Sequence, residues 1–188
     1  MNRKLFDYIA ASPSPYHAVA HSAETLRAAG FLPLSEGEDW DLTPGQGYYV
    51  TRNGSSLIAF RAKRDFSGFL MTASHCDSPT FKIKENAELT GSGCRRLAVE
   101  KYGGMLMSTW MDRPLGIAGR VLLRKGSGIE SRLLDLGGAC AVIPNVAIHM
   151  NRKANDGYSW NPAVDLLPLW GSGEEKGFFR PTLAMALA

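Results

Sequence analysis

The segment from Gly68 to Pro79, GFLMTASHCDSP, constrains the fold of this 188-residue chain more than any other feature. Its apolar residues predict a buried strand over 68–75 that ends in a histidine, with an aspartate two residues later. Side chains alternate along a strand, so His75 and Asp77 would share one face while Cys76 would point to the other. Proline donates no backbone hydrogen bond and ends the strand. The pair is therefore expected where a strand opens into a loop, as sites are in open α/β sheets.

Two interpretations of His75 and Asp77 remain open on spacing alone. A metal-ligating imidazole usually has its second ring nitrogen held by a carboxylate, a carbonyl or water, and Asp77 offers a carboxylate. The pair can equally be a structural histidine at the end of a buried strand, beside an aspartate that forms a turn. A hydrolytic metal site takes three or more protein ligands, so further ligands must decide between the two.

Composition excludes several classes of protein. Hydrophobic residues make up 45% of the chain, which is ordinary for a globular protein with a substantial core. The 21 basic and 18 acidic residues are interspersed, which argues against nucleic-acid binding. We expect no membrane segment, because no apolar stretch approaches the roughly 20 residues that span a bilayer. We expect no signal peptide, because Asp7 interrupts the short apolar segment near the N-terminus and prolines follow at once. Three cysteines without a Cys-x-x-Cys pair favour a reduced, cytoplasmic protein.

Local patterns predict helices and then a sheet in the first part of the chain. Residues 3–11 favour a short helix, and Ser14 can cap a second helix that starts with Pro15 and ends just before Gly30. Strands at 48–52 and 55–62 flank Asn53-Gly54, the pair preferred in two-residue type I′ turns. With the strand at 68–75, these elements indicate an α/β fold, or α+β within this chain alone.

Beyond Pro79 the pattern becomes rich in short strands. Runs that resemble strands occur at 81–84, 115–124, 131–136 and 146–150. The Gly-Ser-Gly triplets at 91–93, 126–128 and 171–173 are expected to be turns. The chain therefore divides into a helix-and-sheet part at 1–84, a β-rich domain at 85–170 and a loop-rich tail at 171–188 that ends in a short helix or strand.

The other histidines are weaker candidates for a site. His17 and His21 lie four residues apart on one predicted helix face with Glu24 beyond, a spacing that can chelate a metal ion. A solvated helix face is the simpler interpretation of these three. His149 is expected on a half-exposed strand, where a histidine is usually structural.

Glutamate, cysteine and serine patterns give no independent catalytic site. Glu174 and Glu175 lie in a polar, glycine-rich loop, whereas a catalytic pair must be held rigidly. Cys76 would face away from His75, which disfavours a Cys-His nucleophile. No Gly-x-Ser-x-Gly motif supports a serine hydrolase.

Five segments together resemble the M18 family of metallo-aminopeptidases, and they occur in the family's order. They are SPSPYHAV at 12–19, YYVTRNGSSLIAF at 48–60, ASHCDSPTFKIK at 73–84, YGGMLMSTWMDRPLGIAGRV at 102–121 and IPNVAIHMNR at 143–152. Five ordered motifs are more specific than any one of them.

The resemblance implies a two-zinc enzyme that removes the N-terminal residue, preferably Asp or Glu, from peptides. It also implies an α/β catalytic domain, begun here by 1–84, that carries an inserted β-rich dimerisation domain at 85–170 and forms homo-oligomers. His75 matches a zinc ligand and Asp77 the carboxylate that orients it. His149 matches a histidine that one subunit presents to the active site of its neighbour.

The family's other zinc ligands and its paired glutamates match nothing in this chain. One imidazole cannot hold two zinc ions, and without the glutamates no general base activates water. We therefore expect the N-terminal portion of an M18 enzyme, arising by truncation, proteolysis or an interrupted reading frame, and inactive alone. The alternative is a non-catalytic assembly module that keeps the β-rich domain. Incomplete sheets leave edges and apolar faces exposed, which favours self-association.

Overall fold

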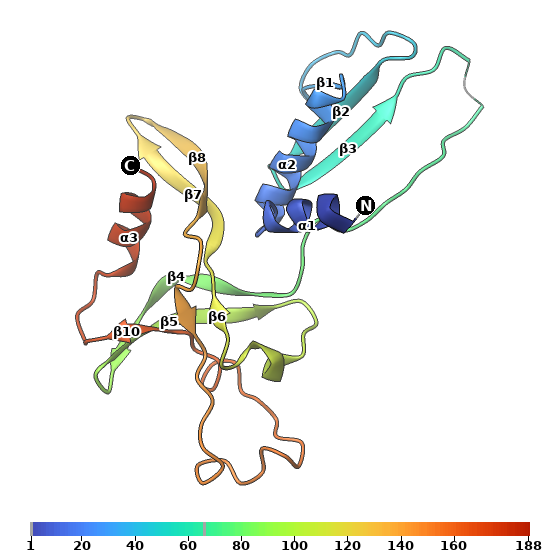
Figure 1. Cartoon of the computed structure of the whole chain (residues 1–188). Helices are drawn as coiled ribbons and strands as arrows, with labels where there is room; N and C mark the ends of the chain where they lie inside the picture. Colours follow the sequence, from blue (N-terminus) through green and yellow to red (C-terminus); the bar gives the residue numbers. More distant parts are fainter. Residues whose placement is uncertain (1, 66) are drawn as a thin grey trace. The chain divides into compact units, whose positions relative to one another are not determined.

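The computed structural model describes residues 2–65 and 67–188, whose contacts divide into two compact units (Figure 1). Unit 1 comprises the described residues up to Ser78 together with Gly119–Leu133. Unit 2 comprises Pro79–Ala118 and Leu134–Ala188. The hairpin of β7 (Ala118–Lys125) and β8 (Gly128–Asp135) thus interrupts unit 2 in sequence and lies mostly in unit 1.

Two helices open unit 1, as the sequence predicted. They are α1 (Asn2–Ala10) and α2 (Pro15–Ala28). The Ser14 hydroxyl accepts a hydrogen bond from the backbone N–H of His17 at 3.4 Å, which satisfies one of the amides left over at a helix start. Past the other end, Gly30 adopts a φ of +81°, the left-handed conformation that glycine permits. Both predicted caps of α2 are confirmed.

The sheet of unit 1 has the order β1-β2-β3, with β1 at Leu32–Pro33, β2 at Gly47–Arg52 and β3 at Ser56–Arg61. β2 runs parallel to β1 and antiparallel to β3. Between β2 and β3, Asn53 and Gly54 both have positive φ, at 53° and 63°. The Ser55 N–H donates to the Arg52 carbonyl at 3.1 Å and closes the turn. These are the features that a type I′ turn requires, so the prediction from Asn-Gly is confirmed.

The core of unit 1 lies between α2 and β2. Figure 1 shows α2 lying along the sheet, and Val19 and Ala23 of this helix are buried. Tyr48, Tyr49 and Val50 of β2 are buried in succession, so both faces of the central strand are covered. β3 is an edge strand and leaves Ile58 70% exposed.

The strand predicted at 68–75 is wrong. No residue from 67 to 79 belongs to a strand, and this segment joins β3 to β4 as irregular backbone. Phe69, Leu70 and Met71 are 78%, 100% and 82% exposed. An apolar run becomes a buried strand only when neighbouring strands and a covering layer enclose it. The described part of the chain provides neither for these residues.

Unit 2 is built on a five-stranded antiparallel sheet in the order β4-β5-β10-β9-β6. Its strands are β4 (Thr80–Gly91), β5 (Cys94–Tyr102), β6 (Pro114–Leu115), β9 (Ala141–Val142) and β10 (Leu169–Ser172). The 3₁₀ helix η1 (Met107–Trp110) precedes β6, and helix α3 (Phe179–Ala186) closes the chain.

Two apolar clusters hold unit 2 together. One joins the β4–β5 hairpin to α3 through the buried residues Ala87, Leu97, Val99 and Phe179. The other contains Met111, Ile143 and Leu166. The residues beyond 170 are therefore part of the packed unit, because β10 joins the sheet and α3 supplies a core side chain.

Several predictions for this region need correction. β5 was not predicted, because charged residues dilute its apolar pattern. The run at 115–124 is split into β6 and β7, and the third Gly-Ser-Gly triplet lies partly in β10. No strand forms at 146–150. Pro144 has no N–H to donate, and the Asn145 side chain accepts the N–H of Val146 at 2.9 Å, so a local turn replaces strand pairing.

Among the described residues, no helix combines the length and apolarity needed to cross a membrane.

Candidate metal centre

His75 and Asp77 form a local pair in unit 1. The Nδ1 atom of His75 lies 2.6 Å from the backbone carbonyl oxygen of Asp77 and 3.3 Å from its carboxylate Oδ1. Both oxygens can only accept, so Nδ1 carries the proton in this arrangement. The neutral imidazole then has its lone pair on Nε2, the nitrogen that can bind a metal ion.

A bend, and not a strand, positions this pair. The chain bends at Cys76, and the ring of His75 folds back onto the residue two positions later. The closer of the two contacts is with a backbone carbonyl, whereas the sequence pointed to the carboxylate. The His75 side chain remains 80% exposed and that of Asp77 38% exposed, so Nε2 is open to other ligands.

His149 lies in unit 2, in the long segment that joins β9 to β10. Residues 148–150 form a turn, and His149 is exposed. The start of this segment is anchored, because the N–H of Asn145 donates to the Asp112 carboxylate at 2.8 Å. Within the described part of the chain, no hydrogen bond is recorded for the His149 side chain. The structure therefore presents it to solvent from a turn, and not from the strand that the sequence predicted.

The weaker candidates have structural roles. The Nδ1 atom of His17 lies 2.8 Å from the Ser14 hydroxyl at the start of α2, and the ring of His21 packs 5.3 Å from that of Tyr8. Glu174 accepts the N–H of Gly93 at 2.7 Å and so ties its loop to the β4–β5 turn. None of these side chains joins the candidate centre.

The donor set fits a zinc-ligand role for His75 but does not complete a site. Among the described residues, no group of three or more His, Cys, Asp and Glu side chains is placed to hold a metal ion. Zinc in proteins is usually held by three or four protein ligands. The described residues thus offer one oriented imidazole of such a set.

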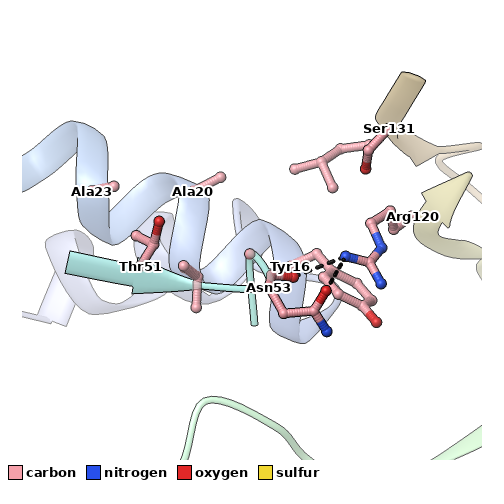
Figure 2. A pocket seen from close by; sticks show the side chains of 10 residues that line it. Tyr16, Ala20, Ala23, Thr51, Asn53, Arg120 and Ser131 are labelled. Carbon is pink, nitrogen blue, oxygen red and sulfur yellow. Dashed lines mark hydrogen bonds between the residues drawn. The ribbon is translucent and has the colours of Figure 1, made fainter. Parts of the chain in front are cut away.

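A pocket in unit 1 was not indicated by the sequence. Residues of α2, the β2–β3 turn and the β7–β8 hairpin line a volume of about 440 Å³ (Figure 2). The guanidinium of Arg120 lies 4.3 Å above the ring of Tyr16, and its Nη1 donates to the backbone oxygen and Oδ1 of Asn53 at 2.8 and 3.0 Å. Asn53 and Arg120 are 67 residues apart, so no local pattern could have paired them.

The comparisons with known proteins decide the family. The family model described as aminopeptidase I zinc metalloprotease (M18) matches residues 8–181. The chain belongs to the M18 family. The resemblance found in the five sequence segments is thereby confirmed, and with it the mixed helix-and-sheet fold class.

Individual relatives of this M18 chain agree over most of its length. A probable M18 family aminopeptidase 2 of Pseudomonas putida (strain GB-1) is 43% identical over 193 residues, which cover 100% of this chain and 45% of that relative. A chain in the cryo-EM structure of the Ape4 and Nbr1 complex is 38% identical with a TM-score of 0.85, over 93% of this chain and 34% of that one.

The S. cerevisiae mApe1 dodecamer is 34% identical with a TM-score of 0.68, over 78% of this chain and 36% of that one. The M18 chain thus spans less than half the length of each of these three relatives.

Proposed function

We propose that this M18 chain contributes part of a zinc aminopeptidase centre that removes N-terminal residues, Asp and Glu in preference to others, from peptides. His75 is the zinc ligand through Nε2, and Asp77 is the residue that positions its ring. The observation that carries this proposal is the contact between Nδ1 and the Asp77 carbonyl, because it directs the imidazole lone pair to Nε2. The remaining ligands and the general base come from residues outside the 188.

The chain's own residues have distinct tasks in this proposal. Bound zinc supplies a Lewis acid and lowers the pKa of a water molecule. The hydrogen bond to Asp77 fixes the tautomer and orientation of His75 and increases its basicity as a ligand. His149 of one subunit enters the neighbouring active site, where its ring can donate to the oxygen of the scissile carbonyl. Its exposure in a turn is consistent with this task.

We further propose that unit 2 mediates homo-oligomerisation. The related mApe1 forms a dodecamer. In unit 2 of this chain, Val146, Ile148 and Met150 flank His149 and are 55%, 49% and 79% exposed. Apolar side chains gathered around a turn favour an interface between subunits. A purely structural assembly module, the second candidate function, would use the same surface and need no metal.

A fusion protein tests the catalytic proposal. Residues 1–188 are joined to the remaining portion of the P. putida relative, and release of N-terminal Asp, Glu and Leu from peptides is measured with zinc and with a chelator. The fusion is expected to release Asp and Glu faster than Leu, and the 188-residue chain alone is expected to release none of them. His75→Ala should lower the activity of the fusion by at least about 100-fold, because a zinc ligand is lost.

His21→Gln is the matched control, because His21 belongs to α2 and packs against Tyr8. It should leave activity unchanged. Zinc-dependent aminopeptidase activity of the 188-residue chain alone would contradict the proposal that the remaining zinc ligands and the general base come from other residues. A folded His75→Ala fusion with full activity would contradict the assignment of His75. An inactive but assembled fusion would favour the assembly module.

A further inference from the structure

We infer that the pocket of unit 1 binds the carboxyl-terminal residue of a peptide that ends in an apolar side chain. This inference is independent of the metal chemistry proposed above, because the pocket contains neither His75 nor Asp77. Figure 2 shows its two sides, with Ala20 and Ala23 on α2 and Arg120 on β7. All the lining residues belong to unit 1.

The pocket joins an apolar wall to one cation. Val19, Ala20 and Ala23 of α2 and Leu133 of β8 supply hydrocarbon surface. Of the ten described residues that line the pocket, Arg120 is the only one that carries a charge. Ligand pockets are typically apolar with a few fixed polar groups that determine orientation and specificity. A ligand that complements this lining combines a hydrocarbon group with an anion.

Arg120 is held in place before any ligand arrives. Its ring contact with Tyr16 and its two hydrogen bonds to Asn53 fix the guanidinium. Both hydrogen bonds are donated by Nη1 of Arg120. Within the described part of the chain, Nε and Nη2 of this residue donate no hydrogen bond. A guanidinium has five N–H donors in a planar fork that matches a carboxylate with two parallel hydrogen bonds. Holding this group in advance reduces the entropy lost on binding.

The charge balance favours a peptide terminus over a free amino acid. A free amino acid carries an ammonium group next to its carboxylate, and no lining residue is an anion that could pair with it. Close to Arg120 this second positive charge would be repelled. In a peptide the same nitrogen belongs to a neutral amide. The hydroxyl of Thr51 or Ser131 on the pocket wall can accept a hydrogen bond from this amide.

The size of the pocket suits such a ligand. Its volume of about 440 Å³ lies within the range of about 300–1,000 Å³ that is typical of small-molecule sites. That is enough for one apolar side chain, its carboxylate and an adjoining peptide group.

Fluorescence anisotropy of the 188-residue chain tests the inference. The probe is fluorescein-labelled Gly-Gly-Gly-Leu with a free carboxylate, compared with the same peptide as its carboxamide. The acid is expected to bind at least about tenfold more tightly than the amide, because the charged hydrogen bonds to Arg120 are lost in the amide. Free leucine is expected to compete at least about tenfold less well than unlabelled Gly-Gly-Gly-Leu.

Three variants locate the binding. Arg120→Met keeps the length of the side chain and removes its charge, and should weaken binding at least about tenfold. Leu133→Asp places a carboxylate in the pocket at a position that is already 39% exposed, so it should abolish binding without unfolding the chain. Arg124 is an exposed arginine on β7, the strand that carries Arg120. Arg124→Met is therefore the matched control and should bind like the wild type.

Four outcomes overturn the inference. They are no measurable binding of the acid, equal binding of acid and amide, undiminished binding by folded Arg120→Met or Leu133→Asp, and competition by free leucine as strong as that by the peptide. Circular dichroism shows whether each variant is folded.

Discussion

The carboxylate of Glu88 on β4 accepts a hydrogen bond from the backbone N–H of Phe179 at 2.8 Å, across 91 positions of sequence. The N–H of Gly177 donates to the same carboxylate. These bonds fix the start of α3, whose side chain Phe179 belongs to the core beneath it. They also hold the pKa of Glu88 below its ordinary value. The hydrogen bond from Phe179 lowers the pKa most, the bond from Gly177 lowers it next, and the positive charge of Arg180 has a smaller effect.

Replacing Glu88 with Ala is expected to destabilise unit 2 by about 1 kcal/mol at neutral pH, because two backbone donors lose a charged partner at a partly exposed site. Glu85→Ala, an exposed change on the same strand, should have no effect. The measurement is urea unfolding followed by circular dichroism.

The same experiment at lower pH checks in which direction the stabilising contribution of Glu88 changes with pH. A lowered pKa in the folded state means that the contribution of Glu88 is complete above the pKa of the unfolded chain, and is lost as the pH falls through the folded value. The stability difference between wild type and Glu88→Ala should therefore shrink in acid. A difference that stays constant down to about pH 3 would contradict this role.

The exposed run Phe69-Leu70-Met71 of unit 1 is expected to add to the self-association that we propose for unit 2. Its residues are 78–100% exposed, and none of them belongs to a strand in the part of the chain that the structure describes. Leu70→Glu should shift the assembly toward monomer in sedimentation velocity. Met185→Glu, at a position 79% exposed on α3, is the control. A wild-type chain that stays monomeric on concentration would contradict the prediction.

Gly54→Ala is expected to cost about 1 kcal/mol, because a residue with a side chain must adopt the left-handed φ of +63° at the β2–β3 turn. Nothing lies within 4 Å of the added Cβ, so the cost comes from the backbone and not from a clash. Gly37→Ala, where the space is also open and φ is not positive, should be neutral. Thermal unfolding of both variants gives the comparison, and equal stabilities would exclude the proposed turn geometry.

In its neutral form, His75 is expected to be the tautomer protonated at Nδ1, since this nitrogen donates to the Asp77 carbonyl. Nitrogen chemical shifts of the ring, measured by long-range ¹H–¹⁵N correlation, distinguish the two tautomers. Asp77→Ala should preserve the preference, because the backbone carbonyl remains. His149, for which the described residues record no hydrogen bond, is the internal reference. A neutral His75 protonated at Nε2 would be incompatible with the proposed metal ligation.

Features that depend on neighbours in sequence were predictable. The cap of α2 at Ser14 and the turn at Asn53-Gly54 require only residues within three positions of one another. The pairing of His75 with Asp77 was also foreseen, although the expected strand is absent, because a bend brings residues two positions apart into the same contact. The family could likewise be recognised from the order of short motifs.

Features that depend on partners distant in the sequence could not be predicted from it. The run at 68–75 has the composition of a buried strand, yet a strand exists only where other strands complete its hydrogen bonds, and none does so in the described chain. The segment at 146–150 was mispredicted for a local reason, because the Asn145 side chain accepts the N–H of the adjacent Val146 and competes with strand pairing.

The sequence by itself therefore determined the caps of α2 and the β2–β3 turn, since short-range hydrogen bonding and steric preference act within a few residues. Its resemblance to the M18 family singled out His75 as the candidate zinc ligand. Only the tertiary structure decided which apolar segments are enclosed, how Glu88 holds α3, and that Arg120 meets Tyr16 and Asn53 at a pocket. The physical reason is that burial and long-range hydrogen bonds belong to pairs of segments, and their partners are set by the folded chain as a whole.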